Sequence, residues 1–140
     1  MIAEAVLDTN VLVYAVSGTP DDAKKQAVAL ELLETAEIGL SGQILQEFLV
    51  TATKKIRQPL SVDDALDWIE TFEEFPCIPI DSALVRQGAE VALRYQLSYW
   101  DGAILAAAHR LGANVLYTED LNHGQLYGSV RVVNPFRPNE

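Results

Sequence analysis

Residues 3–10 read Ala3-Glu4-Ala5-Val6-Leu7-Asp8-Thr9-Asn10, a short apolar run that ends on an acid. A second apolar stretch, 11–14, follows at once. This pattern predicts a buried strand whose C-terminal end carries the Asp8 carboxylate, then a turn into a helix. Ligands of open α/β sheets bind beyond the carboxyl ends of the strands. Asp8 is therefore a candidate site residue, and the alternative is that it only caps the next helix.

The composition is that of a folded chain with one core. The chain has 140 residues, of which 49% are hydrophobic, and this length suits a single domain. No apolar run approaches the roughly 20 residues of a membrane span. The first residues lack the layout of a signal peptide, and one cysteine, Cys77, excludes an internal disulfide. We therefore expect a cytoplasmic protein that does not bind membranes.

The charge is strongly negative, with 20 acidic against 10 basic residues and a net charge of -10. Such a balance argues against non-specific nucleic-acid binding, which relies on basic surface. It suits a protein that gathers carboxylates around a divalent cation, or one with a basic partner. The sequence has no His-x-x-x-His or Cys-x-x-Cys spacing, so a zinc site is not expected.

Strands are expected to alternate with helices along the chain. Apolar spacing predicts helices over 21–36, 42–57, from Ser61 onward, from Asp81 or Ser82 to about 97, and over 100–111. Short strands or extended pieces are predicted at 38–41, 76–80, 114–118 and 130–133, with a loop over 119–128. This alternation predicts an α/β fold with a parallel sheet covered by helices on both faces.

Asp101 and Asp120 stand out among the remaining acids. Asp101 lies in the first turn of the predicted buried helix, on a side that is otherwise apolar. A helix N-terminus stabilises a carboxylate by only about 0.3–1 kcal/mol, which does not offset the burial of an unpaired charge. Asp120, with Glu119 beside it, directly follows a predicted strand, as Asp8 does. The alternatives are an ordinary first-turn acid and an ordinary turn acid.

Glu47 is the fourth acid of interest, because it falls in the first two turns after the strand at 38–41. Its helical stripe is polar, so a solvated helix face is the alternative. If such acids converge, two carboxylates about 4 Å apart repel by roughly 4 kcal/mol at an effective dielectric constant of 20. Partial protonation relieves this repulsion, but a hard divalent cation such as magnesium or manganese relieves it better.

Four stretches, taken in this order, resemble the PIN domain family, and within it the VapC-type toxins of bacterial toxin–antitoxin pairs: Leu7-Asp8-Thr9-Asn10-Val11-Leu12; Ser41 with Glu47; Tyr99-Trp100-Asp101-Gly102-Ala103-Ile104-Leu105-Ala106-Ala107-Ala108; and Thr118-Glu119-Asp120. The likeness covers almost the whole chain. It implies a three-layer α/β/α PIN-like fold with a central, mostly parallel sheet, as one domain over 1–140. One departure is Gly102, where alanine is the commoner residue.

The resemblance also implies an activity. It implies a Mg²⁺- or Mn²⁺-dependent endoribonuclease that hydrolyses phosphodiester bonds and leaves a 5′-phosphate and a 3′-hydroxyl. The family's catalytic and metal-binding acids fall here on Asp8, Glu47, Asp101 and Asp120. Asn10 and Thr118 would orient those acids, and Glu119 is the alternative to Asp120 as the fourth acid.

The implied partners are an RNA substrate, a cognate antitoxin laid over the cleft, and a second copy of the chain. For the RNA backbone we expect a basic track on the helix that carries Glu47, formed by Lys54, Lys55 and Arg57. The alternative is a helix end whose lysines are only solubilising. An apolar set is either core or partly a dimer face: Trp68, Ile69, Phe72 and Phe75.

Two other functions compete with the nuclease. A haloacid-dehalogenase-like phosphatase also starts with an aspartate after its first strand, but needs a second acid two residues later, where this chain has Asn10. A catalytically inert PIN-like module that only binds RNA or protein is the other alternative. The set of four acids speaks against it.

Overall fold

The computed structural model describes residues 2–137 and contains a sheet in the order β3-β2-β1-β4-β6-β5. Neighbouring strands are parallel except β5 and β6, which pair antiparallel. The bounds of the strands are β1 Ala5–Leu7, β2 Ile38–Ser41, β3 Cys77–Ile78, β4 Val115–Tyr117, β5 Leu126–Tyr127 and β6 Val130–Val133. The predicted α/β fold with a mostly parallel sheet is confirmed.

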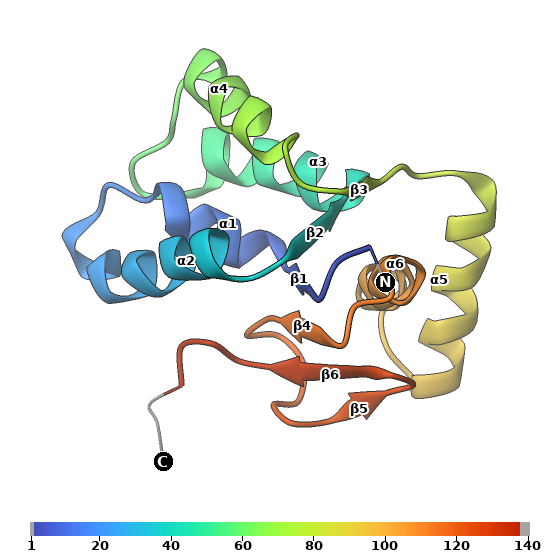
Figure 1. Cartoon of the computed structure of the whole chain (residues 1–140). Coiled ribbons are helices and arrows are strands. Elements are labelled where there is room, and N and C mark those ends of the chain that lie inside the picture. The colour runs from blue at the N-terminus through green and yellow to red at the C-terminus, as the bar shows by residue number, and fades with distance from the viewer. Residues whose placement is uncertain (1, 138–140) are drawn as a thin grey trace.

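Helices cover the sheet, with α1 to α4 on one side of β1 and β2 and with α5 and α6 on the other (Figure 1). Their bounds are α1 Thr9–Val16, α2 Ala23–Thr35, α3 Gly42–Val50, α4 Val62–Phe72, α5 Ser82–Tyr95 and α6 Tyr99–Leu111. A short 3₁₀ turn, Pro20–Asp22, precedes α2. Within residues 2–137, no helix has the length and apolar character needed to cross a membrane.

Strand β1 holds the central position that the opening sequence predicts. It pairs with β2 on one side, through Ala5 and Ile38, and with β4 on the other, through Leu7 and Tyr117. Val6 is fully buried, as expected for a parallel strand covered on both faces. The chain leaves β1 toward β2 and returns later to β4, so a crevice opens at the carboxyl end of β1.

Two glycines allow α5 and α6 to pack closely, side by side. A Cβ atom added to Gly102 would collide with the carbonyl oxygen of Gly88 and lie 2.8 Å from the Cβ of Ala92. One added to Gly88 would lie 2.9 Å from the Cα of Ala103. Gly102, the departure from the family pattern, therefore has a packing role, and it fixes where the N-terminus of α6 lies.

Two expectations about the elements are wrong. The loop predicted over 119–128 contains strand β5, which pairs with β6 after a turn at Gly128 with φ of +62°. The helix predicted over 42–57 is an α-helix only as far as Val50, and Thr51–Lys55 is a π-helix. A π turn holds more residues than an α turn, so it shifts which side chains after Val50 share a face with Glu47.

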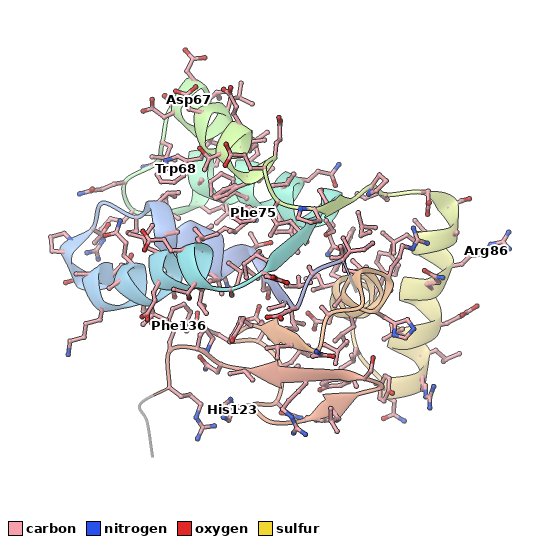
Figure 2. All side chains as sticks on the ribbon, viewed as in Figure 1. Asp67, Trp68, Phe75, Arg86, His123 and Phe136 are labelled. Carbon is pink, nitrogen blue, oxygen red and sulfur yellow. The ribbon has the colours of Figure 1, made fainter. Side chains whose placement is uncertain are left out.

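The apolar set on and after α4 belongs to the core. Phe72 is fully buried, with its ring centroid 5.1 Å from that of Phe48 on α3. Trp68 stacks on Phe72 at 6.0 Å, and Ile69 and Phe75 are partly buried against the same core. Figure 2 shows Trp68 on the side of α4 that faces α3, whereas Asp67 points outward.

We expect the substitution Gly102→Ala to destabilise the fold. Alanine is favoured over glycine inside a helix by up to about 1 kcal/mol, but overpacking against a backbone carbonyl costs about 1–3 kcal/mol or more. The free energy of unfolding, measured by chemical denaturation, should fall by about 1–2 kcal/mol. Gly18→Ala is the control, since its Cβ would meet only the flexible Gln58 side chain at 3.3 Å. Equal stabilities of Gly102→Ala and the parent would contradict the packing role.

Candidate functional site: an acidic cleft at the carboxyl end of β1

The Asp8 carboxylate sits at the end of β1, and 6% of the residue is exposed. One oxygen, Oδ1, accepts a hydrogen bond of 2.7 Å from the backbone N–H of Thr9, at the start of α1. The other, Oδ2, accepts one of 2.7 Å from the hydroxyl of Thr118. Asp8 thus caps α1 and also lies at the mouth of the sheet. The helix cap and the candidate site residue are therefore compatible interpretations of its position.

Burial raises the pKa of Asp8 to about 6. The hydrogen bonds from Thr118 and Thr9 favour the charged form and lower the pKa, but by less than burial raises it. The negative charges of Asp120 and Glu47 raise it further. Both charges that shift the pKa of Asp8 are negative, so these neighbours favour its protonated form.

Glu47 approaches Asp8 from α3, where two side chains hold it. Its Oε2 accepts a hydrogen bond of 2.9 Å from the Thr9 hydroxyl, and its Oε1 accepts one of 3.0 Å from Gln43 Nε2. The same Gln43 nitrogen donates to the backbone carbonyl of Trp100 at 3.2 Å. Glu47 is therefore not an ordinary solvated residue, because these bonds join it to α1 and to α6.

Asp120 enters the site from the loop after β4. Its backbone N–H donates to the hydroxyl of Thr118 at 3.1 Å, and that hydroxyl donates to Asp8. Thr118 thereby fixes the position of Asp120 relative to Asp8. The neighbouring Glu119 turns elsewhere and pairs with Lys25 at 2.8 Å, so the structure brings Asp120 rather than Glu119 to the cleft.

Asp101 stands at the N-terminus of α6, where the Ser98 hydroxyl accepts its backbone N–H at 3.1 Å. Its side chain is half-buried, and desolvation is the largest cause of a raised pKa. The charges of Asp120 and Glu47 raise the pKa of Asp101 as well. Asp120 and Glu47 therefore act on both Asp8 and Asp101, although Asp101 does not line the cleft itself.

The cleft has a volume of about 450 Å³. It is lined by three of the acids and by residues of α1, α3, the π-helix and α6: Asp8, Thr9, Asn10, Gln43, Gln46, Glu47, Val50, Thr51, Lys55, Trp100 and Asp120. Asn10 lines the cleft but makes no hydrogen bond to an acid within residues 2–137, while the adjacent Thr9 makes the bond to Glu47. Thr9 and Asn10 are both polar residues directly after Asp8. Their positions in the sequence do not tell which of the two contacts an acid.

The predicted basic track is only partly present. Lys55 lines the cleft, whereas Lys54 is exposed outside its lining. Arg57 pairs with Asp21 at 3.4 Å on the surface. Lys55 follows Gln43, Glu47 and Thr51 at successive intervals of four residues, so it shares their face.

The donor set fits a hard divalent cation in its chemistry, since carboxylate oxygens are the ligands that magnesium and manganese prefer. The arrangement is not a preformed metal cage. Within residues 2–137, no three Asp, Glu, His or Cys side chains are close enough together to hold an ion. Both oxygens of Glu47 are held by neighbours, so side chains must turn toward an ion for it to bind.

We expect Asp8→Asn to stabilise the metal-free protein at neutral pH. With a pKa of about 6 in the fold against 3.8 otherwise, Asp8 keeps its proton when folded between these values and loses it when unfolded. Its contribution to stability therefore falls as pH rises from about 4 to 6, by about 3 kcal/mol in total. Asparagine stays neutral, so melting temperatures should favour Asp8→Asn at pH 7–8 and converge near pH 4.

Asp67→Asn controls for this prediction, because it removes one carboxylate from the exposed face of α4 (Figure 2). A gain in stability for Asp8→Asn that stays the same at pH 4 and pH 8 would show that charge burial is not its cause.

Comparisons with known proteins agree with this architecture. Among solved structures, the chain is similar to a toxin–antitoxin complex from Klebsiella pneumoniae, with a TM-score of 0.71 and 22% identity over 96% of this chain and 100% of that chain. It is also similar to VapC20 of Mycobacterium tuberculosis, described as a Sarcin-Ricin loop cleaving toxin (TM-score 0.66, 17% identity, 84% of this chain and 90% of that chain). DNA-bound VapBC from Salmonella typhimurium gives a TM-score of 0.62 and 19% identity over 93% and 96%.

At these identities the structures show a shared fold. No curated protein matches the sequence. The family model described as the PIN domain matches residues 5–128, most of the chain. This chain therefore belongs to the PIN domain family, whose members are generally nucleases.

Proposed function

We propose that this protein is a metal-dependent endoribonuclease, a VapC-like toxin that uses Mg²⁺ or Mn²⁺ to hydrolyse RNA. One observation carries the proposal: the buried Asp8 carboxylate shares a cleft with Glu47 and Asp120, whose negative charges add to the effect of burial and raise its pKa. Such a site is unfavourable in an inert module, because each charge costs stability. It becomes favourable when a divalent ion is bound.

In this proposal Asp8 and Asp101 hold the ion directly, and Glu47 and Asp120 hold it directly or through water. A divalent cation bound there supplies a water of lowered pKa and neutralises the charge that develops on the phosphate. Thr118 and the Thr9 amide favour the ionised form of Asp8 and fix its direction by donating to its two oxygens. Thr9 and Gln43 hold Glu47 ready beside it.

The chain's own cation at the cleft is Lys55, which we assign to a phosphate of the RNA backbone. A cognate antitoxin as partner is supported by the family and by the toxin–antitoxin complexes of similar fold. We retain a homodimer in the cytoplasm as part of the proposal. The phosphatase alternative loses its support, since the chain belongs to another family.

The activity is tested by incubating the purified protein with mixed RNAs in Mg²⁺ or Mn²⁺, against EDTA. We expect cleavage that needs the metal and falls at least about 100-fold in Asp8→Asn, because even residues that only support metal ligands cost about 10–100-fold when lost. Asp67→Asn should cleave as the parent does. Cleavage that persists in EDTA, or that Asp8→Asn retains, would contradict the proposal, and no cleavage with any RNA would favour the inert module.

Metal binding itself has a second readout. An ion at 100 times its dissociation constant stabilises the fold by about 2.7 kcal/mol. Mg²⁺ or Mn²⁺ should therefore raise the melting temperature of the parent and not that of Asp8→Asn, which offsets most of the difference expected without metal. Equal shifts in the two proteins would place the ion elsewhere.

Lys55→Ala should weaken RNA binding and flatten its dependence on salt. One lost phosphate contact lowers the slope of log affinity against log salt by about 1. Lys54→Ala is a matched control, with the same change of charge one residue away but outside the cleft. Binding is measured by fluorescence anisotropy in the Asp8→Asn background. Equal effects of the two substitutions would argue for general charge and against a contact in the cleft.

A further inference from the structure

Trp100 is an exposed aromatic residue at the edge of the acidic cleft. It is the second residue of α6, directly before Asp101, and 62% of it is exposed. Its neighbours on α6 from Gly102 to Ala108 are buried, so packing of the helix does not account for it. Trp100 lines the acidic cleft, so a ligand bound in the cleft would contact it.

The structure anchors the backbone of Trp100 and supports its ring on one side. The backbone carbonyl of Trp100 accepts a hydrogen bond from Gln43, the residue that also holds Glu47. The ring of Tyr99 meets the indole edge-on, with centroids 5.2 Å apart and planes at 75°. A ring fixed before binding loses little conformational entropy when a ligand stacks on it.

Trp100 also separates the cleft from a second, smaller hollow of about 60 Å³. That hollow has mainly apolar walls, formed by Ile80, Leu84, Tyr99 and Ala103 together with Gln43, Gln46 and Trp100. Gln46 lines both hollows. Its side-chain amide is exposed and has no hydrogen bond within the part of the chain that the structure describes, unlike that of Gln43.

We propose that Trp100 and Gln46 form a nucleobase subsite next to the acids. An unpaired base stacks on the indole, and its edge exchanges hydrogen bonds with the Gln46 amide, which both donates and accepts. This inference rests on the proposed function, because the phosphate of the same or the adjacent nucleotide then lies over Asp8, Glu47 and Asp120. It adds base recognition, and with it a preference for the nucleotide at the cut.

Base stacking suits this protein because it needs no positive charge. Aromatic stacking contributes about 5- to 100-fold in affinity per base and accepts every base. Selection among bases is then left to the amide, since each base edge presents its own donors and acceptors. A base inside a duplex has both faces covered, so it does not reach the indole.

The first experiment uses the fluorescence of Trp100. The chain has two tryptophans, so Trp68→Phe makes Trp100 the single reporter, and Asp8→Asn prevents cleavage. An unpaired RNA octamer should quench the emission, and a hairpin of the same composition should not. Octamers with one abasic nucleotide, tested at each position, should lose the quenching at one or two positions. Quenching that is the same for the octamer, the hairpin and every abasic octamer would overturn the subsite.

The second experiment measures affinity for the labelled octamer by anisotropy in Asp8→Asn protein. Trp100→Leu should weaken binding about 5- to 100-fold, and Trp100→Phe, which keeps a ring, by much less. Leu93→Ala is the control, because Leu93 is 83% exposed on α5 and lines neither hollow. Unchanged affinity in Trp100→Leu would overturn the proposal and leave Trp100 as a contact for a protein partner.

The third experiment maps the cut sites of otherwise active protein by sequencing the RNA ends. Gln46→Leu should change which bases flank the cuts that remain, and an unchanged pattern would overturn the role of Gln46. The outcomes separate this inference from the proposed function. If the parent protein cleaves RNA but none of these effects is seen, the subsite is rejected and the nuclease activity stands. If RNA binds and quenches the Trp100 emission but is not cleaved by the parent protein, the nuclease activity is rejected and the subsite stands.

Discussion

The burial of one carboxylate at the end of the central strand is the constraint on which this structure depends. Asp8 follows β1, whose residues are shielded on both faces, so its side chain lies in a poorly solvated place. Two donors, the Thr9 amide and the Thr118 hydroxyl, reduce the cost of its charge but do not remove it. A fold that retains such a residue trades stability for function, and the molecule around Asp8 is arranged to make use of it.

The order of strands determines which residues can meet Asp8. β1 lies between β2 and β4, and each of these parallel strands leads into a segment that carries an acid. β2 runs directly into α3 with Glu47, and β4 into the turn with Asp120. Asp101 reaches the acids differently, because it lies at the N-terminus of α6. The close contact of Gly102 with Gly88 sets how near that end of α6 lies to α5. The packing of two helices thus bears on the geometry of the acids.

Features that depend on hydrophobic periodicity and on the order of the elements along the chain could be predicted from the sequence. Alternating strands and helices predicted a parallel sheet, and the carboxyl ends of its strands pointed to Asp8 and Asp120. Strand β3 was predicted despite its two residues, because prolines flank it, whereas β5 and the π-helix were not predicted. β5 has two residues, Leu126–Tyr127, too few to show alternation. The π-helix at Thr51–Lys55 has no signature in composition, and the position of Lys55 rather than Lys54 in the cleft was not predicted.

The net charge of -10 and an RNA substrate are compatible only if affinity comes from something other than a basic surface. Counterion release by many lysines and arginines is the usual source, and here a single lysine lines the described cleft. A bound divalent ion would turn the acids from a repulsive group into an attractive one for phosphate, and stacking on an aromatic ring is insensitive to the sign of the surroundings. The same acids that repel RNA from the metal-free protein would therefore admit it once the ion is bound. An exposed indole beside them would add affinity that does not depend on positive charge.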